Sequence, residues 1–162
     1  MNMKTIIFYR SITGLFAVMA LWTLTSCSPE QPPEVQLRTL VDKGELAAER
    51  RELGPLRQLI SEHYGDERGY DKKQIVGMVR FYLLGHQKIH LLTKISGIDI
   101  IDDKRSQLTV FAAMSGKPIS GAQNLISIKA KLMRFDISFA KEGNDWKVIT
   151  AVWRQAQIDD FL

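Results

Sequence analysis

The spacing of apolar residues along the chain changes once, near Gly85. Before this residue, apolar side chains recur every three or four positions, which is the period of one helix face. The spacing predicts three helices, at residues 35–51, 55–64 and 71–85. Asp71 and Gln74 stand at the positions of a capping box at the start of the third helix, and Gly85 is a typical stop signal.

After Gly85, apolar and polar residues alternate, which is the two-residue period of β-strands. The alternation predicts strands at about residues 89–101, 108–114, 126–140 and 146–156. Gly97 marks a bulge or bend in the first of them, and turn-forming residues at 102–105 and 141–145 join neighbouring strands. Helices followed by strands predict an α+β domain over residues 35–162, in which three N-terminal helices pack on one face of a curved antiparallel sheet of about four strands.

The first 26 residues have a different pattern. Lys4 and Arg10 precede an uncharged, mostly apolar run at residues 11–26. A positive start followed by a short apolar region is typical of a secretory signal peptide. The run is shorter than the roughly 20 residues that a membrane-spanning helix needs, so residues 1–26 are predicted to be a signal peptide.

Cys27 is the only cysteine of the chain and directly follows Leu24-Thr25-Ser26. These four residues resemble the lipobox of bacterial lipoproteins. The resemblance implies diacylglycerol on the Cys27 sulfur, cleavage before Cys27, and acylation of the new amino terminus with a fatty acid such as palmitate. A lone cysteine in a secreted chain needs an explanation, and lipidation supplies one. The alternative is a chance thiol at the end of an ordinary signal peptide.

The residues after Cys27 indicate where the lipid anchor would hold the protein. Ser28 stands where Asp marks retention in the inner membrane of Gram-negative lipoproteins. By that family rule, the protein is expected in the cell envelope, on the periplasmic face of the outer membrane if the cell is Gram-negative. Residues 27–34 are predicted to be a lipidated N-terminus and linker, because prolines at 29, 32 and 33 give them an extended composition.

Composition limits the class of protein. Removing the 26-residue signal peptide from the 162 residues leaves 136, enough for one domain that needs no disulfide or metal for its core. Lys4 and Arg10 account for two of the 22 bases, which leaves 20 against 18 acids. The remaining bases and acids are interleaved, so the sequence predicts no nucleic-acid partner.

The order of the predicted elements and the C-terminal segment Asp145-Trp146-Lys147-Val148-Ile149-Thr150-Ala151-Val152-Trp153-Arg154 resemble the nuclear transport factor 2-like (NTF2-like) superfamily. The resemblance covers about residues 35–156. It implies a cone-shaped α+β barrel with a cavity between helices and sheet, and a homodimer through the outer sheet face. The superfamily contains steroid isomerases, dehydratases, polyketide cyclases and members without catalysis, so the fold does not decide the function.

Four side chains are candidates for general acid–base chemistry in such a cavity, namely Tyr64, Asp66, His90 and Asp136. This chemistry needs a titrating group with a shifted pKa next to the substrate. Each candidate also has a structural explanation, such as a helix end for Tyr64, a loop for Asp66, or a strand pair with Arg134 for Asp136. The structural explanation is preferred, so no catalytic residue is assigned.

An apolar ligand site is the other possibility. Its candidate residues are Phe135, Phe139, Trp146, Trp153 and Arg134. The alternative is that the aromatic residues form the sheet core and that Trp153-Arg154 belongs to a subunit contact. His86 and His90 have metal-ligand spacing, but they fall in a strand region beside Lys88, which would repel a dication. No metal site and no cofactor are predicted.

Together these patterns predict a membrane-anchored envelope lipoprotein that is non-catalytic. Its domain is expected to bind a small apolar or amphipathic ligand or an envelope protein partner. The alternative is a hydratase- or isomerase-like enzyme that uses acid–base residues in the cone cavity.

Overall fold

The structure is a computed structural model that describes residues 30–161. The predicted signal peptide, Cys27 and Ser28 lie outside the described residues. Within the part described, no helix is long and apolar enough to span a membrane.

Three helices precede the sheet, as the apolar spacing predicted. They are α2 (Pro33–Glu49), α3 (Leu53–Leu59) and α4 (Lys72–Gly85). The predicted capping box of α4 is present: the Asp71 carboxylate accepts a hydrogen bond from the Gln74 amide at 2.8 Å, and the Asp71 amide donates to Gln74 Oε1 at 2.9 Å. These two bonds satisfy amide groups that a first helical turn otherwise leaves free.

The second helix is shorter than predicted, because it ends at Leu59 and not near Tyr64. Ile60 forms a parallel bridge with Val148, and the Ser61 amide donates to the Val148 carbonyl oxygen at 2.9 Å. The Gly65 amide donates to the carbonyl oxygen of Ile149 at 3.0 Å. The chain after Leu59 therefore follows a sheet edge, whose free backbone groups replace the next turn of helix.

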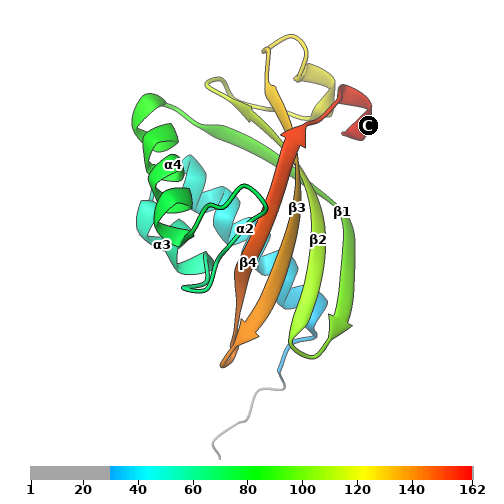
Figure 1. Cartoon of the computed structure of the whole chain (residues 1–162). Coiled ribbons are helices and arrows are strands. Elements are labelled where there is room, and N and C mark those ends of the chain that lie inside the picture. Colours follow the sequence, from blue (N-terminus) through cyan, green and yellow to red (C-terminus); the bar gives the residue numbers. More distant parts are fainter. Residues whose placement is uncertain (1–29, 162) are drawn as a thin grey trace, which may run out of the picture. The chain divides into compact units, whose positions relative to one another are not determined.

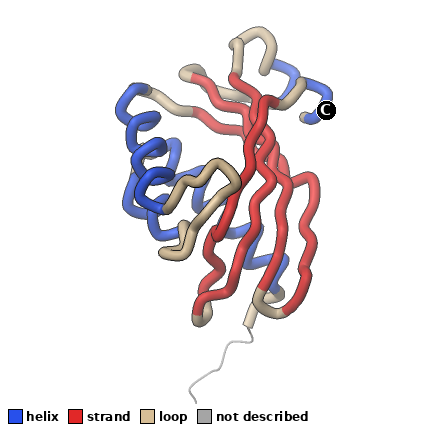
Figure 2. Tube along the Cα trace, in the orientation of Figure 1, coloured by secondary structure: helices blue, strands red, loops and turns tan. Residues whose placement is uncertain are grey.

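Four antiparallel strands form one sheet in the order β1-β2-β3-β4. Their bounds are β1 (His90–Asp102), β2 (Arg105–Ser115), β3 (Lys131–Glu142) and β4 (Asp145–Gln155). The register shifts between Ile95 and Gly97, which confirms the predicted bulge. β3 begins at Lys131 and not near residue 126, because the preceding residues form the short helix η2 (Ala122–Asn124) and further turns. Figures 1 and 2 show the sheet bending along its length, with the helices on one side.

The sheet has a hydrophobic cluster on each face. The cluster facing α2 comprises Leu37, Leu108, Val110, Phe139 and Trp146. The opposite cluster comprises Phe111, Ala113, Leu125, Ala156 and Phe161, from β2 and from segments near η2 and the C-terminal helix η3 (Ile158–Asp160). Val110 and Phe111 belong to different clusters because successive side chains of a strand point to opposite faces. The predicted α+β architecture is confirmed.

Candidate functional site

A groove of about 360 Å³ lies between α2, α3 and the hairpin that joins β3 to β4. Its apolar lining consists of Leu40, Leu46, Ala47, Pro55, Leu59 and Trp146. Its polar lining consists of Lys43, Glu52, Gln58, Asp145 and Lys147. An apolar floor with a few polar groups is typical of small-molecule sites, and this volume lies at the lower end of their range.

The chain reverses direction between α2 and α3 to build one wall of the groove. Arg51 takes the left-handed conformation with φ 59°, and the Glu52 amide donates to the Ala47 carbonyl oxygen at 2.8 Å. α2 packs closely on α3 at Gly44, where a Cβ would lie at the ordinary van der Waals distance of 3.4 Å from Leu59 Cδ1.

Trp146 forms part of the groove and part of the core. Its side chain is only 2% exposed and belongs to the cluster that packs against α2. Its indole Nε1 is buried and has no hydrogen-bond partner among residues 30–161. An unpaired buried donor costs free energy. The ring is therefore held in place by its packing in the cluster and not by a hydrogen bond.

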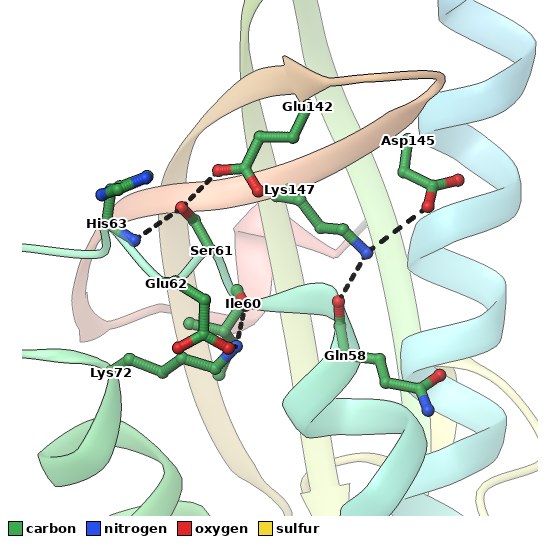
Figure 3. Close-up of polar contacts among 9 residues, drawn as sticks. All are labelled: Gln58, Ile60, Ser61, Glu62, His63, Lys72, Glu142, Asp145 and Lys147. Atoms are coloured by element: carbon green, nitrogen blue, oxygen red, sulfur yellow. Dashed lines mark hydrogen bonds and ion pairs between the residues drawn. The ribbon is translucent and has the colours of Figure 1, made fainter.

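A polar network fixes the rim of the groove, as Figure 3 shows. Lys147 Nζ donates to the Gln58 carbonyl oxygen at 2.9 Å and lies 3.7 Å from the Asp145 carboxylate. On the far side, Ser61 Oγ donates to Glu142 Oε1 at 2.5 Å. These contacts tie α3 and the segment after it to the β3–β4 hairpin.

Lys72 extends this network to α4. Its Nζ donates to the Ile60 carbonyl oxygen at 2.6 Å and to Glu62 Oε1 at 2.8 Å. The hydrogen bond from Lys72, together with its charge, lowers the pKa of the exposed Glu62 carboxyl. Lys72 therefore connects α4 to the segment that follows α3.

Ser61, His63 and Glu142 lie together but do not form a nucleophile with its base. The His63 contact to Ser61 Oγ, at 2.9 Å, comes from the backbone amide, and within residues 30–161 the imidazole ring makes no hydrogen bond to Ser61 or Glu142. Ser61 is also only 1% exposed. A serine that lacks both a neighbouring imidazole nitrogen and access to a substrate is structural.

No protein-family model matches the sequence, and a search of curated proteins finds no match. Solved structures do match. Bd1075 of Bdellovibrio bacteriovorus has a TM-score of 0.59 and 12% identity, over 74% of this chain and 40% of that one. A protein provisionally assigned as a dehydratase of the NTF2-like family, from Streptomyces avermitilis, has a TM-score of 0.58 and 10% identity, over 76% and 96%.

An NTF2-like protein of unknown function from Silicibacter pomeroyi has a TM-score of 0.57 and 12% identity, over 75% of this chain and 94% of that one. The fold is NTF2-like. At such identities, the similarity establishes the fold and not the activity.

The predicted acid–base candidates lie outside the groove of this NTF2-like domain. Tyr64 OH donates to Asp66 Oδ2 at 3.1 Å, while Asp66 Oδ1 accepts from the amides of Arg68 and Tyr70 at 2.9 and 3.0 Å. Burial, and then the Asp66 charge, raise the pKa of Tyr64 to about 12. The pair orders the loop before α4.

Asp136 lies on the sheet face opposite α2. Arg134 Nε is 3.0 Å from both carboxylate oxygens of Asp136, and Thr109 Oγ1 donates to Oδ1 at 2.8 Å. The hydrogen bonds from Arg134 lower the pKa of Asp136, despite its partial burial. Arg134 pairs across the ladder with Phe111, and strand alternation puts His90 on this same face. Arg134 and Asp136 of β3 therefore point away from the helices.

The aromatic residues predicted to bind a ligand do not lie together at one site. Phe139 and Trp146 belong to the core that faces α2, and of these Trp146 lines the groove. Phe135 pairs with Trp153 across β3 and β4, and the guanidinium of Arg68 lies 4.2 Å from the centre of the Trp153 ring. Within residues 30–161, no group of three potential metal ligands is present.

Sequence reasoning missed most of the groove. Leu40, Leu46, Pro55 and Leu59 follow an ordinary helical spacing, which predicts a packed helix face as readily as a binding wall. Lys43, which also lines the groove, carried no local motif either. The groove forms only because the β3–β4 hairpin lies beside these two helices in the folded chain.

The raised pKa of Tyr64 predicts a loss of stability at high pH. The folded protein holds the phenol proton up to about pH 12, whereas the unfolded chain releases it near pH 10. Stability should therefore fall as the pH rises through this window, by at most about 1.4 kcal/mol per pH unit from this group. Urea unfolding at increasing pH should show a shallower decline in Tyr64→Phe, and Tyr70→Phe is the control from the same loop. An identical decline in Tyr64→Phe and the unsubstituted protein would contradict this prediction.

Proposed function

We propose that this chain is a non-catalytic lipoprotein of the cell envelope, anchored through a lipid on Cys27, whose NTF2-like domain binds a small amphipathic molecule in the α2–α3 groove. The N-terminal sequence supports the anchor. The observation that carries the binding proposal is the groove, with its apolar floor and charged rim. The proposal is of binding and not of catalysis because Tyr64, Asp66, His90 and Asp136 lie elsewhere.

The groove chemistry favours a ligand with an apolar tail. Leu46 is 47% exposed although it is a large apolar residue beside Leu40 and Leu59. Covering such a surface with a ligand removes apolar area from water, at about 25 cal/mol per Å². The exposed apolar wall thus supplies the driving force for binding an alkyl chain.

The rim contains two lysines and two carboxylates, and Lys43 is the cation that a ligand head group can pair with. Lys43 lines the groove and makes no ion pair or hydrogen bond through its ammonium group within residues 30–161. Lys147, in contrast, already donates to the Gln58 carbonyl oxygen and lies near Asp145. Lys43 is therefore the cation available to a ligand carboxylate, which makes a fatty-acid-like amphiphile the best fit.

Calorimetric titration of the unlipidated chain, starting at Ser28, with decanoate tests this proposal. Leu46→Asp places a negative charge in the apolar wall and should weaken decanoate binding about tenfold or more. Val35→Asp is the matched control, because Val35 lies on the same helix with 43% exposure and does not line the groove. Lys43→Ala should reduce the preference for decanoate over decanol.

Equal decanoate affinity in Leu46→Asp and Val35→Asp would overturn the proposed site. Absence of binding by the unsubstituted chain to decanoate and to decanol would overturn the proposed ligand class. Unchanged unfolding midpoints in all variants would exclude misfolding as the cause of a loss.

A further inference from the structure

α4 has an apolar face that no part of the described chain covers. Its packed side includes Leu83, which is buried, and contacts α3. On the other side, Met78 is 39% exposed, Phe81 80% and Leu84 68%. Met78 is exposed although it follows Ile75 at the three-residue spacing of one helix face. Figure 1 shows α4 as an outlying helix of the domain.

The three exposed residues form one stripe. Met78, Phe81 and Leu84 follow each other at intervals of three, so they lie within about one third of the helix circumference. Single exposed apolar residues are common on soluble proteins, whereas a contiguous stripe containing a nearly fully exposed Phe marks an interaction surface. We call Met78, Phe81 and Leu84 the outer stripe.

The surroundings of the outer stripe are positively charged. Residues 72–98 contain five Lys or Arg residues and no Asp or Glu. Of these bases, Lys72 pairs with Glu62, and Lys94 donates to the Asp160 carbonyl oxygen at 3.2 Å. Lys73, Arg80 and Lys88 are exposed, and their charged groups have no ion pair or hydrogen bond within residues 30–161.

The helix geometry places two of these free bases beside the stripe. At about 100° per residue, Lys73 and Arg80 both fall next to Leu84 on the edge of the outer stripe. Arg51 brings another base near the C-terminal end of α4, because its Nε donates to the Leu83 carbonyl oxygen at 3.0 Å. A basic border along an apolar stripe is the composition of helices that lie in a membrane interface.

We propose that the outer stripe and the bases beside it dock α4 onto an anionic lipid surface. Phe81 and Leu84 would enter the boundary between head groups and acyl chains, and Lys73 and Arg80 would contact lipid phosphates. A second copy of the chain fits this face poorly, because a two-fold contact through α4 brings the bases of both helices into one interface, and α4 carries no acid to pair with them. Charge complementarity therefore selects the lipid.

This inference rests on the lipid anchor of the proposed function. Cys27 precedes the start of α2 at Pro33 by six residues, a span of at most about 20 Å. An anchor of this length keeps the domain near the membrane, so docking of α4 is an intramolecular step. A contact that would be weak for a free domain then suffices to orient the anchored one.

The test uses the full lipidated chain reconstituted in vesicles with brominated acyl chains, which quench tryptophan fluorescence on contact. Phe81→Trp reports on the outer stripe. Ile126→Trp is the matched control, since Ile126 is 72% exposed and lies in the loop after η2. Subtracting the signal of the unsubstituted chain removes the contribution of Trp146 and Trp153.

In vesicles containing phosphatidylglycerol, Phe81→Trp should be quenched and Ile126→Trp should not. In pure phosphatidylcholine vesicles, the quenching of Phe81→Trp should weaken strongly. Adding Arg80→Ser should lower the docking equilibrium constant about fivefold, the effect of one positive charge near an anionic surface. High salt should act in the same direction.

Equal quenching of the two tryptophan variants, or quenching of Phe81→Trp that is independent of lipid charge, would overturn the docking proposal. A concentration-dependent dimer in sedimentation that Phe81→Ser abolishes would assign the stripe to a second copy and overturn it too. Failure of the chain to float with neutral vesicles would contradict the lipid anchor, whereas flotation without quenching of Phe81→Trp would contradict only the docking.

Discussion

Cys27→Ser is expected to leave the protein unacylated and to prevent cleavage before residue 27. Under the proposed function, the Cys27 sulfur carries the diacylglycerol, and acylation of this sulfur is the signal for cleavage. The variant should therefore keep residues 1–26. Intact-mass measurement of the purified protein should show loss of the acyl mass together with retention of the mass of residues 1–26.

Ser28→Asp is the companion variant, and in a Gram-negative host it should redirect the lipidated protein to the inner membrane. Cleavage of Cys27→Ser before residue 27, or an unmodified sulfur in native material, would contradict the lipoprotein prediction.

Leu37→Ala is expected to lower the free energy of unfolding by about 2–5 kcal/mol. Leu37 is 0% exposed and packs in the cluster with Leu108, Val110 and Phe139. Truncation leaves a cavity between α2 and the sheet that rigid strands cannot close. Since domains of this size are typically stable by about 5–15 kcal/mol, the loss is a large part of the total.

Urea unfolding measures this effect, and Val35→Ala is the control. Val35 lies two residues earlier on α2 and is 43% exposed, so its truncation should change the unfolding free energy by less than about 1 kcal/mol. Similar losses in the two variants would show that α2 does not pack on the sheet as described here.

Local signals predicted most of the secondary structure. The capping box of Asp71 and Gln74, the bulge near Gly97 and the turn after Glu142 all depend on interactions between near neighbours. Such interactions are readable from a few consecutive residues. The errors occurred where distant segments compete for the same backbone groups, as when Ile60 leaves the helix to pair with Val148.

The candidate site was less predictable. Strand alternation places Arg134 and Asp136 on one face and Phe139 on the other, but it does not tell which face the helices cover. The groove joins Leu46 of α2 to Trp146 of β4, which are far apart in sequence. A pattern within a few consecutive residues cannot show that two such distant residues meet in the fold.

The sequence by itself determined the type and order of the helices and strands, because period, caps and turns are properties of neighbouring residues. It also carries the whole basis for the predicted lipid anchor, in residues that precede the described domain. Only the tertiary structure decided that α2 fills the space against the sheet, that Arg134 and Asp136 of β3 face away from the helices, and that α4 exposes Phe81. Both faces of the sheet carry apolar residues, so the sequence does not tell which face the helices cover. The packing of the whole chain determines this.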